Sequence, residues 1–245
     1  MARTLGVAAS ALIGILAGLT NSGLTNVAVA GTSGCAHLGG NVQGGNICRL
    51  HDFKPTYTID LQFNTDYSDD GPVTDYITQQ RDEVINASLA PGASSLPYVL
   101  EVNYTFFRSG QATRTTPEYG QPWHGTASLV LNTYKSMDNP GLTTYKSFTF
   151  DYEQNRPVTF DNLFAPGTNP MDSLYPAVAN ELQRQFRERH FKLPQNVGRD
   201  PAHYQNFAIT DDAVIFFFGT SELLPQEAGY FFAPIPRAAL PPLQL

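Results

Sequence analysis

The sequence predicts an α+β fold, in which a mixed or antiparallel sheet carries two packed helices. Strand patterns occur before, between and after two helical patterns, and short turns join several strands into hairpins. Apolar residues alternate in the strands and recur every three to four positions in the helices. No internal repeat is visible. The length of residues 31–245 is typical of a single domain, so one α+β domain is expected there.

The first thirty residues have the pattern of a signal peptide. Arg3 precedes a weakly apolar run, Leu5–Leu19, and Ala28-Val29-Ala30 is the small-x-small pattern that signal peptidase recognises. Cleavage is therefore expected before Gly31. The alternative is an uncleaved membrane anchor, but the apolar run is short and rich in glycine for a span. The sequence predicts a secreted, extracellular protein with no membrane segment after cleavage, either released or associated with the cell wall.

The charge of the chain is acidic. It carries 15 Lys and Arg against 22 Asp and Glu, and loss of Arg3 with the signal peptide leaves 14 against 22, a net charge of −8. This balance argues against a nucleic-acid partner, which requires clustered cations. It is compatible with a cationic partner, although acidity also promotes solubility. No phosphate-binding or dinucleotide fingerprint is present, so no cofactor is expected, and we expect a monomer.

Only two cysteines occur, Cys35 and Cys48. An exported chain meets an oxidising environment, so a disulfide is expected, which contributes on the order of 3 kcal/mol for a loop of this length. The alternative is a zinc site that adds His37 and His51, which follow the cysteines as C-x-H and C-x-x-H. Neither spacing is the usual one for zinc, and no metal is expected. The glycine-rich stretch from 31 to 47 is predicted to be an irregular arm.

An N-terminal lobe is expected over about residues 52–152. Its predicted elements are strands at 56–63, 97–107, 125–136 and 142–152 and a helix from about Pro72 to Leu89. Polar residues with Pro and Gly predict a mobile loop at 108–122 and a turn at 138–141. Residues 156–164 continue as an extended segment.

A C-terminal lobe is expected over about residues 157–239. Its helix follows Pro170 and carries an i, i+4 stripe of apolar residues, with cations near its C-terminal end that suit the helix dipole. The stripe is Leu174, Val178, Leu182 and Phe186. Strands at 206–210 and 213–218 are joined by the Asp211-Asp212 turn, and a last strand covers 230–236. Three consecutive phenylalanines, Phe216–Phe218, require cover on both faces, so the 213–218 strand is predicted to be central.

The loop at 219–229 contains the nearest approach to a nucleophile motif. Gly219-Thr220-Ser221-Glu222-Leu223 follows a strand, as a nucleophile elbow does, but it lacks the second glycine and the following helix. His203 and Asp211 flank the hairpin and could complete a triad with Ser221. This pattern gives the hypothesis of a weak secreted carboxylesterase. The simpler interpretation is that the loop only connects two strands.

Long ordered stretches of the chain resemble a known family. The segments are Asp200-Pro201, Tyr204–Thr210, Val214–Phe218, Glu222–Pro225, Ala228-Gly229 and Ile235–Arg237, with Tyr76–Asp82, Thr144–Phe148 and Pro157–Asp161 upstream. Together they resemble the secreted immunogenic antigen family of mycobacteria. The resemblance covers most of the mature chain, including the two cysteines. This chain differs from its relatives at Asn139-Pro140-Gly141-Leu142, where the relatives carry a histidine. Any activity that needs this histidine is therefore not expected here.

The resemblance also has functional implications. The family is similar to the extracytoplasmic domain of lysozyme-sensing anti-sigma factors, which implies a β-grasp-like C-terminal lobe and a loop that binds a protein. The matching contact loop comprises Ser221, Glu222, Leu223, Leu224, Pro225 and Gln226. The expected function is a secreted immunogenic binding module for a protein such as a lysozyme, or for a cell-wall or host component. Replacing Glu222 by Lys is then expected to weaken binding of a cationic partner without altering the fold. A structural wall protein with no discrete site is the remaining alternative.

Overall fold

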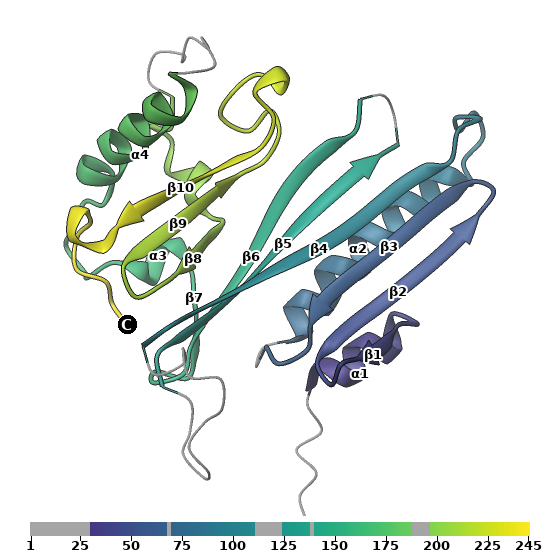
Figure 1. Ribbon diagram of the computed structural model, residues 1–245, viewed down its shortest axis with the longest axis horizontal. Helices are drawn as coiled ribbons and strands as arrows, with labels where there is room; N and C mark the ends of the chain where they lie inside the picture. Colours follow the sequence, from purple (N-terminus) through teal and green to yellow (C-terminus); the bar gives the residue numbers. More distant parts are fainter. Residues whose placement is uncertain (1–29, 68–69, 111–123, 138–139, 188–196) are drawn as a thin grey trace, which may run out of the picture.

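Two β-sheets form the framework of the protein (Figure 1). The computed structural model describes residues 30–67, 70–110, 124–137, 140–187 and 197–245. The larger sheet has seven strands in the order β1-β2-β3-β4-β5-β6-β7, and the smaller has three in the order β10-β9-β8. β3 and β4 are parallel, whereas their neighbours pair antiparallel. The predicted α+β class with a mixed sheet is therefore confirmed.

The bounds of the elements are as follows. The larger sheet contains β1 (Asn41–Gln43), β2 (Ile47–Lys54), β3 (Tyr57–Asn64), β4 (Tyr98–Ser109), β5 (Thr126–Ser136), β6 (Leu142–Asp151) and β7 (Arg156–Val158). The smaller sheet contains β8 (Phe207–Ile209), β9 (Ala213–Phe218) and β10 (Phe231–Pro236). The helices are α1 (Ala30–His37), α2 (Asp70–Ser88), α3 (Phe160–Leu163) and α4 (Met171–Phe186), with short 3₁₀ helices η2 (Pro201–Tyr204), η3 (Gln226–Ala228) and η4 (Arg237–Ala239).

Helix α2 makes the crossover between the parallel strands β3 and β4 and covers one face of the larger sheet (Figure 1). Its apolar residues Val73, Ile77 and Val84 are buried in one cluster with alternating residues of the sheet. The sheet side of this cluster includes Ile59, Leu61, Leu100, Val102, Leu129 and Leu131. The predicted helix and the alternation in the flanking strands are both confirmed.

The N-terminal segment is more ordered than the sequence indicated. Residues 31–47 were expected to be irregular, but they contribute α1 and β1, and the unpredicted strand β2 pairs along its length with β3. The charged side chains of β2 hide its alternation in the sequence. The disulfide between Cys35 and Cys48 is formed, as predicted, and joins α1 to β2. The zinc alternative is wrong, because both sulfurs are in this bond and are not available as thiolate ligands.

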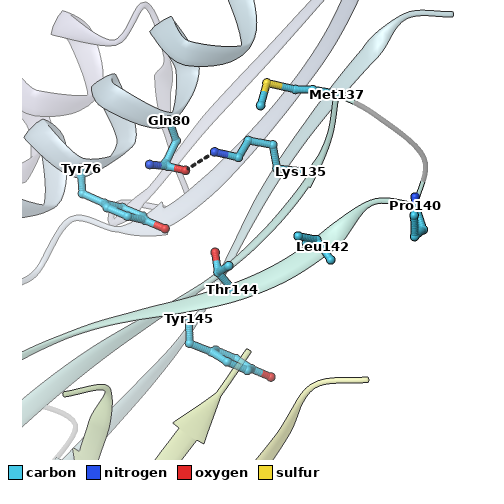
Figure 2. Close-up of a pocket in the computed structure, with 8 residues that line it drawn as sticks. All are labelled: Tyr76, Gln80, Lys135, Met137, Pro140, Leu142, Thr144 and Tyr145. Atoms are coloured by element: carbon cyan, nitrogen blue, oxygen red, sulfur yellow. Dashed lines mark hydrogen bonds between the residues drawn. The ribbon is translucent and has the colours of Figure 1, made fainter. Parts of the chain in front are cut away.

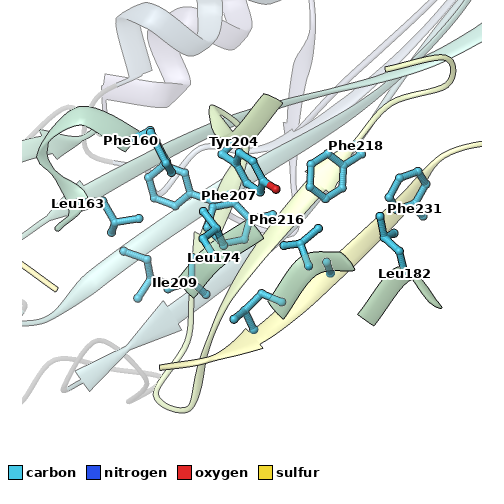
Figure 3. Packing of buried hydrophobic residues seen from close by; sticks show 14 of the residues in the cluster. Phe160, Leu163, Leu174, Leu182, Tyr204, Phe207, Ile209, Phe216, Phe218 and Phe231 are labelled. Atoms are coloured by element: carbon cyan, nitrogen blue, oxygen red, sulfur yellow. The ribbon is translucent and has the colours of Figure 1, made fainter. Parts of the chain in front are cut away.

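The smaller sheet and α4 enclose a second core (Figure 3). Leu174, Val178, Leu182 and Phe186 of α4 are all buried against β9 and β10, which confirms the predicted stripe. β9 is the central strand, as the three phenylalanines indicated. Phe216 and Phe218 lie in the cluster with α4, whereas Phe217 belongs to another cluster with Val130 and Ala208. Both faces of β9 are therefore covered.

Phe217 and a set of buried hydroxyl groups join the two sheets. The Phe217 ring lies 5.9 Å from that of Phe107 on β4 and 5.3 Å from that of Tyr145 on β6. On the same interface, the Ser128 hydroxyl oxygen accepts hydrogen bonds from the backbone N–H of Ile209 and from the Thr149 hydroxyl, at 3.1 and 2.9 Å. Because the contact combines apolar packing with paired polar groups, the smaller sheet has a fixed position on the larger one.

The segment at 156–164 changes its structure part-way. β7 pairs with β6, so the larger sheet continues to Val158, and α3 begins at Phe160 where an extended segment was expected. The side-chain oxygen of Asn162 accepts a hydrogen bond from the backbone N–H of Thr159 at 2.8 Å and fixes this turn. The C-terminal lobe thus begins after β7. The lobe that was expected to be β-grasp-like consists of helix α4 packed on the sheet β10-β9-β8, in which all pairing is antiparallel.

Strand β10 forms one edge of the smaller sheet. Its residues alternate between buried and exposed, with Phe232, Pro234 and Pro236 exposed. The Phe232 carbonyl accepts a hydrogen bond from the side-chain amide of Gln185 on α4 at 2.9 Å. After β10 the chain returns to α3, where Leu243 pairs with Phe164.

Three expectations from the sequence lie wholly or mostly outside the described residues. These are the signal peptide, the greater part of the loop at 108–122 and the Asp138-Asn139 turn. In the part of the chain that the structure describes, none of the helices combines the length and hydropathy needed to cross a membrane.

Candidate functional site

The loop from Gly219 to Gly229 contains the predicted contact residues 221–226 and is called the contact loop below. Its first residues are fixed to β6. The Thr220 N–H donates to the Thr143 carbonyl at 2.8 Å, and the Thr220 hydroxyl oxygen accepts from the Thr143 N–H at 3.3 Å. A Cβ atom on Gly219 would lie 2.9 Å from the Thr143 carbonyl oxygen, so only glycine allows this approach. The contact loop therefore begins in a defined position beside the larger sheet.

The Glu222 side chain closes the first turn of the contact loop. Its Oε2 accepts a hydrogen bond from the Gly219 N–H at 2.7 Å, and its own N–H donates to the Gly219 carbonyl at 3.2 Å. Burial raises the pKa of the Glu222 carboxyl, while the Gly219 hydrogen bond and the nearby His203 act in the opposite direction. The sequence indicated that Glu222 is a surface contact that can be replaced by Lys without altering the fold. The internal hydrogen bond indicates that this substitution would also change the loop.

His203 approaches the contact loop from η2. Its Nδ1 lies 4.0 Å from Glu222 Oε1. Two contacts fix η2: the Asp200 carboxylate accepts from the Ala202 N–H at 2.9 Å, and the buried Tyr204 hydroxyl donates to the Gly198 carbonyl at 2.5 Å. Burial raises the pKa of Tyr204, so this hydroxyl stays protonated. His203 is thus held on a rigid turn with one ring nitrogen directed at a carboxylate.

The structure brings His203 to Glu222, the residue that follows Ser221, but places Asp211 elsewhere. Asp211 lies in the turn before β9, whereas Ser221 follows the end of that strand. The Asp211 carboxylate instead accepts a hydrogen bond from the Gly110 N–H at 2.6 Å. The predicted triad is therefore wrong in its acid, because the length of β9 separates the two positions. Glu222 occupies the place beside His203 that was assigned to Asp211.

Ser221 is exposed and has a left-handed backbone, with φ at 65°. Such a conformation is uncommon for a residue other than glycine and often marks a functional turn. Among the hydrogen bonds of the described residues, none links the Ser221 and His203 side chains. Active-site hydrogen bonds are often long before substrate binds, so the arrangement is compatible with a nucleophile and a base.

The remaining residues of the contact loop combine a buried anchor with exposed positions. Leu224 is buried in the C-terminal core, Leu223 packs partly against it, and Gln226 begins η3. Pro225 and Glu227 are exposed. The loop ends at Gly229, whose φ of 73° favours glycine. The contact loop therefore presents a few side chains from a fixed backbone.

A polar groove of about 530 Å³ adjoins the contact loop. It lies over the face of the larger sheet that is opposite α2. Its lining residues are Glu101, Asn103, Tyr104, Thr105, Asn132, Tyr134, Thr143 and Tyr230. The sequence analysis did not find this groove, because the groove exists only where the C-terminal lobe approaches the sheet.

A second, more apolar pocket of about 540 Å³ lies between α2 and the ends of β5 and β6 (Figure 2). Its lining residues are Tyr76, Gln80, Lys135, Met137, Pro140, Leu142, Thr144 and Tyr145. The Lys135 ammonium group donates to Gln80 at 3.1 Å and to Glu83 at 2.6 Å. Its charge is therefore already paired within the protein. Over the described residues, no cluster of three or more His, Cys, Asp or Glu side chains forms a metal site.

Comparison with known proteins assigns the family. Over 207 residues the chain is 33% identical to the immunogenic protein MPT64 of Mycobacterium tuberculosis, covering 84% of this chain and 86% of that protein. The chain belongs to the MPT64 family. Within it, 212 residues are 43% identical to a Mycobacterium tuberculosis protein named esterase Rv3036c, over 86% of this chain and 88% of that protein.

Part of the chain also matches a family of unknown function. Residues 161–238 match the family described as "Protein of unknown function (DUF3298)", which spans the C-terminal lobe from α3 to η4. A crystal structure of a DUF3298 family protein from Pseudomonas aeruginosa PAO1 aligns with a TM-score of 0.48 at 12% identity, covering 79% of this chain and 91% of that one.

Proposed function

We propose that this chain is an exported protein that binds another protein through the contact loop. The motivation is the signal-peptide pattern at residues 1–30 together with membership of a family in which relatives are named immunogenic proteins. An exported protein of this kind acts outside the cell, either free or at the cell wall. Its immunogenicity follows from that location and not from a particular chemical activity.

The observation that supports binding most directly is the rigidity of the contact loop. Its first residues are hydrogen-bonded to β6, Glu222 closes its first turn, and Leu224 anchors its centre in the core. A loop that is already ordered loses little conformational entropy when it binds, so its exposed side chains can contribute more to affinity. Ser221, Pro225 and Glu227 are the exposed residues of this loop with side chains.

The proposed partner is a cationic protein. The mature chain has a net charge of −8, and the contact loop carries two carboxylates, of which that of Glu227 is exposed. A cationic partner is attracted to such a surface, and the rate of association falls as salt screens the charges. A lysozyme meets this description and is the partner class that the sequence resemblance implied.

The test is the affinity of the mature chain for lysozyme, measured by biolayer interferometry at low and physiological salt. We expect Glu227→Lys to weaken binding, while Glu153→Lys, which changes an exposed acid in the β6–β7 turn, leaves it unchanged. Using Glu227 avoids the structural role of Glu222. Equal affinities for both variants, or no binding by the unmodified chain at low salt, would contradict the proposal.

A second candidate function is ester hydrolysis, favoured by the 43% identical relative named esterase Rv3036c and by the position of His203 beside Glu222, the residue that follows Ser221. In this scheme the Ser221 hydroxyl attacks the ester carbonyl carbon and His203 Nε2 takes its proton, while Glu222 orients the ring from Nδ1. The alcohol leaves with that proton, and water then releases the acid. The scheme requires His203 to turn towards Ser221 when substrate binds.

The esterase candidate is tested with p-nitrophenyl butyrate and the purified mature chain. We expect Ser221→Ala and His203→Ala to abolish hydrolysis without changing the melting temperature, whereas Asp211→Asn, away from Ser221, retains it. Equal hydrolysis by the unmodified chain and Ser221→Ala would exclude Ser221 as the nucleophile. Absence of hydrolysis in all of them would remove this candidate and leave the binding proposal in place.

A further inference from the structure

The polar groove beside the contact loop is a product of strand alternation and partial cover. On β4, Leu100 and Val102 point into the core under α2, so Glu101 and Asn103 lie on the opposite face. The strand register places Asn103 directly opposite Asn132 and Glu101 directly opposite Tyr134 on β5. Four side chains of this face are therefore immediate neighbours.

The same sheet face is apolar or internally hydrogen-bonded where the smaller sheet covers it. There the positions corresponding to Asn132 and Tyr134 are occupied by Ser128 and Val130, which are 0% and 2% exposed. Beyond the edge of the smaller sheet the face becomes polar, and the groove opens at this change. The groove is thus lined by strands of the larger sheet on one side and by Tyr230, directly before β10, on the other.

One wall of the groove is aromatic. Tyr230, which directly follows the contact loop, is 53% exposed and packs edge-on against Tyr145 with ring centres 5.9 Å apart. Large aromatic side chains that remain half exposed beside a concave surface are typical of binding sites.

The opposite wall offers fixed hydrogen-bonding groups. The Asn103 side-chain oxygen accepts a hydrogen bond from the Gln62 amide, which leaves its NH₂ group for a ligand. The Asn132 side chain is hydrogen-bonded to the Tyr145 hydroxyl, and burial of this hydroxyl raises the pKa of Tyr145 to about 12. Both amides are therefore held in one orientation, so a ligand would meet preorganised donors and acceptors.

The charges of the lining limit the class of ligand. Glu101 carries the negative charge of the groove, and the described lining residues include neither Lys nor Arg. A phosphorylated, sulfated or carboxylated ligand would find no counter-charge there. Amides and hydroxyls instead match a neutral molecule rich in hydroxyl groups, and the Glu101 carboxylate can accept from such hydroxyls.

We propose that this groove binds a neutral oligosaccharide. A pyranose ring has an apolar C–H face, which can stack on Tyr230, and a rim of hydroxyl groups, which can bind Asn103, Asn132 and Glu101. The volume of about 530 Å³ is within the range of sites for small ligands. This inference adds a second binding site, with a different class of ligand, to the protein-binding contact loop.

The test is isothermal titration of the mature chain with maltohexaose, cellohexaose and chitohexaose, with oligogalacturonate as the anionic comparison. At least one neutral oligosaccharide should bind at millimolar concentration or below, and the anionic one should not. We expect Tyr230→Ala to weaken binding about tenfold or more, as the loss of a stacking contact and its buried area implies. Asn103→Ala should weaken it in the same direction.

The matched controls are Phe53→Ala, an exposed aromatic residue on β2, and Asn86→Ala, an exposed amide on α2. Both should bind like the unmodified chain. The groove proposal is overturned if none of the neutral oligosaccharides binds, if the anionic one binds equally well, or if the groove variants and the controls behave alike. Failure of lysozyme binding in the Glu227 experiment would not affect this result, because the probes and the variants differ.

Discussion

The Glu222 carboxylate accepts a hydrogen bond from the backbone N–H of Gly219, three residues earlier, at 2.7 Å. This bond closes the turn that begins the contact loop, while the other carboxylate oxygen faces His203. An acidic side chain that the sequence marks as a surface contact is therefore part of the structure of the loop. The same residue sets the direction in which the loop leaves β9.

The buried position of Glu222 predicts a pH dependence of stability. Its pKa is raised above the ordinary value of 4.5, so the folded protein holds this proton more tightly than the unfolded chain. Its contribution to stability is therefore fully present below pH 4.5 and is lost as the pH rises through the raised pKa. We expect Glu222→Gln, which keeps an acceptor for Gly219, to gain stability relative to the unmodified chain as the pH rises.

The measurement is urea unfolding of both proteins from about pH 4 to pH 6, the range in which a carboxyl group with a raised pKa titrates. The difference in unfolding free energy isolates this group from the other carboxylates. A difference that does not change with pH, or changes in the opposite direction, would show that Glu222 titrates normally.

The hydroxyl of Ser128 couples the two sheets through hydrogen bonds, so its removal should lower the stability of the protein. It accepts from the Ile209 N–H and from Thr149, and Ser128 is fully buried. Ser128→Ala leaves the Ile209 donor without its partner, which costs about 1–3 kcal/mol of unfolding free energy. Urea unfolding measures the loss, and Ser95→Ala on the exposed loop before β4 should change stability by less than about 0.5 kcal/mol. Equal values for the two variants would contradict the coupling.

Phe217 makes the apolar part of the same interface. Its ring contacts Phe107, Tyr145 and Phe232, so Phe217→Ala removes contacts on both sheets. We expect a loss of about 3–5 kcal/mol in unfolding free energy. Phe53→Ala, where the side chain is 58% exposed, serves as the control and should cost far less. A small loss for Phe217→Ala would mean that the sheets are held together mainly by the hydroxyl contacts.

The position of Gly40 beside the disulfide leaves no room for a side chain. A Cβ atom there would lie 2.9 Å from both the Cys48 sulfur and the Arg49 carbonyl oxygen. We expect Gly40→Ala to lower the unfolding free energy by about 1–3 kcal/mol through this overpacking. Gly71→Ala in α2 has no atom within 4 Å of the new Cβ, so it should be neutral or stabilising. Thermal unfolding under oxidising conditions distinguishes the two, and equal melting temperatures would contradict the requirement.

The features predicted correctly from the sequence depend on local periodicity. The stripe of α4 and the three phenylalanines of β9 follow from spacing alone, and both are buried as expected. Strand β2 was missed because its charged residues mask the alternation, and its order comes from pairing with β3 and from the disulfide. These contacts join residues that a local pattern does not connect.

The candidate site illustrates the same limit. Ser221, His203 and Asp211 were grouped because His203 and Asp211 flank the hairpin, but the structure places His203 beside Glu222 and Asp211 against Gly110. A strand of six residues between Asp211 and the contact loop separates them in space, so Glu222 faces the histidine. The polar groove could not be predicted, because one wall is formed by strands of the larger sheet and the other by Tyr230, and their separation depends on how Phe217 and Ser128 pack the smaller sheet on the larger one.

The edge strand β10 has a consequence for the behaviour of the protein at high concentration. Pro234 and Pro236 have no N–H to offer, and the Phe232 carbonyl is already bound by Gln185. An unprotected edge invites a strand of another molecule to continue the sheet, and prolines at such an edge prevent this. The smaller sheet is therefore closed to intermolecular strand addition along β10, which protects the protein from polymerising through this edge at high concentration.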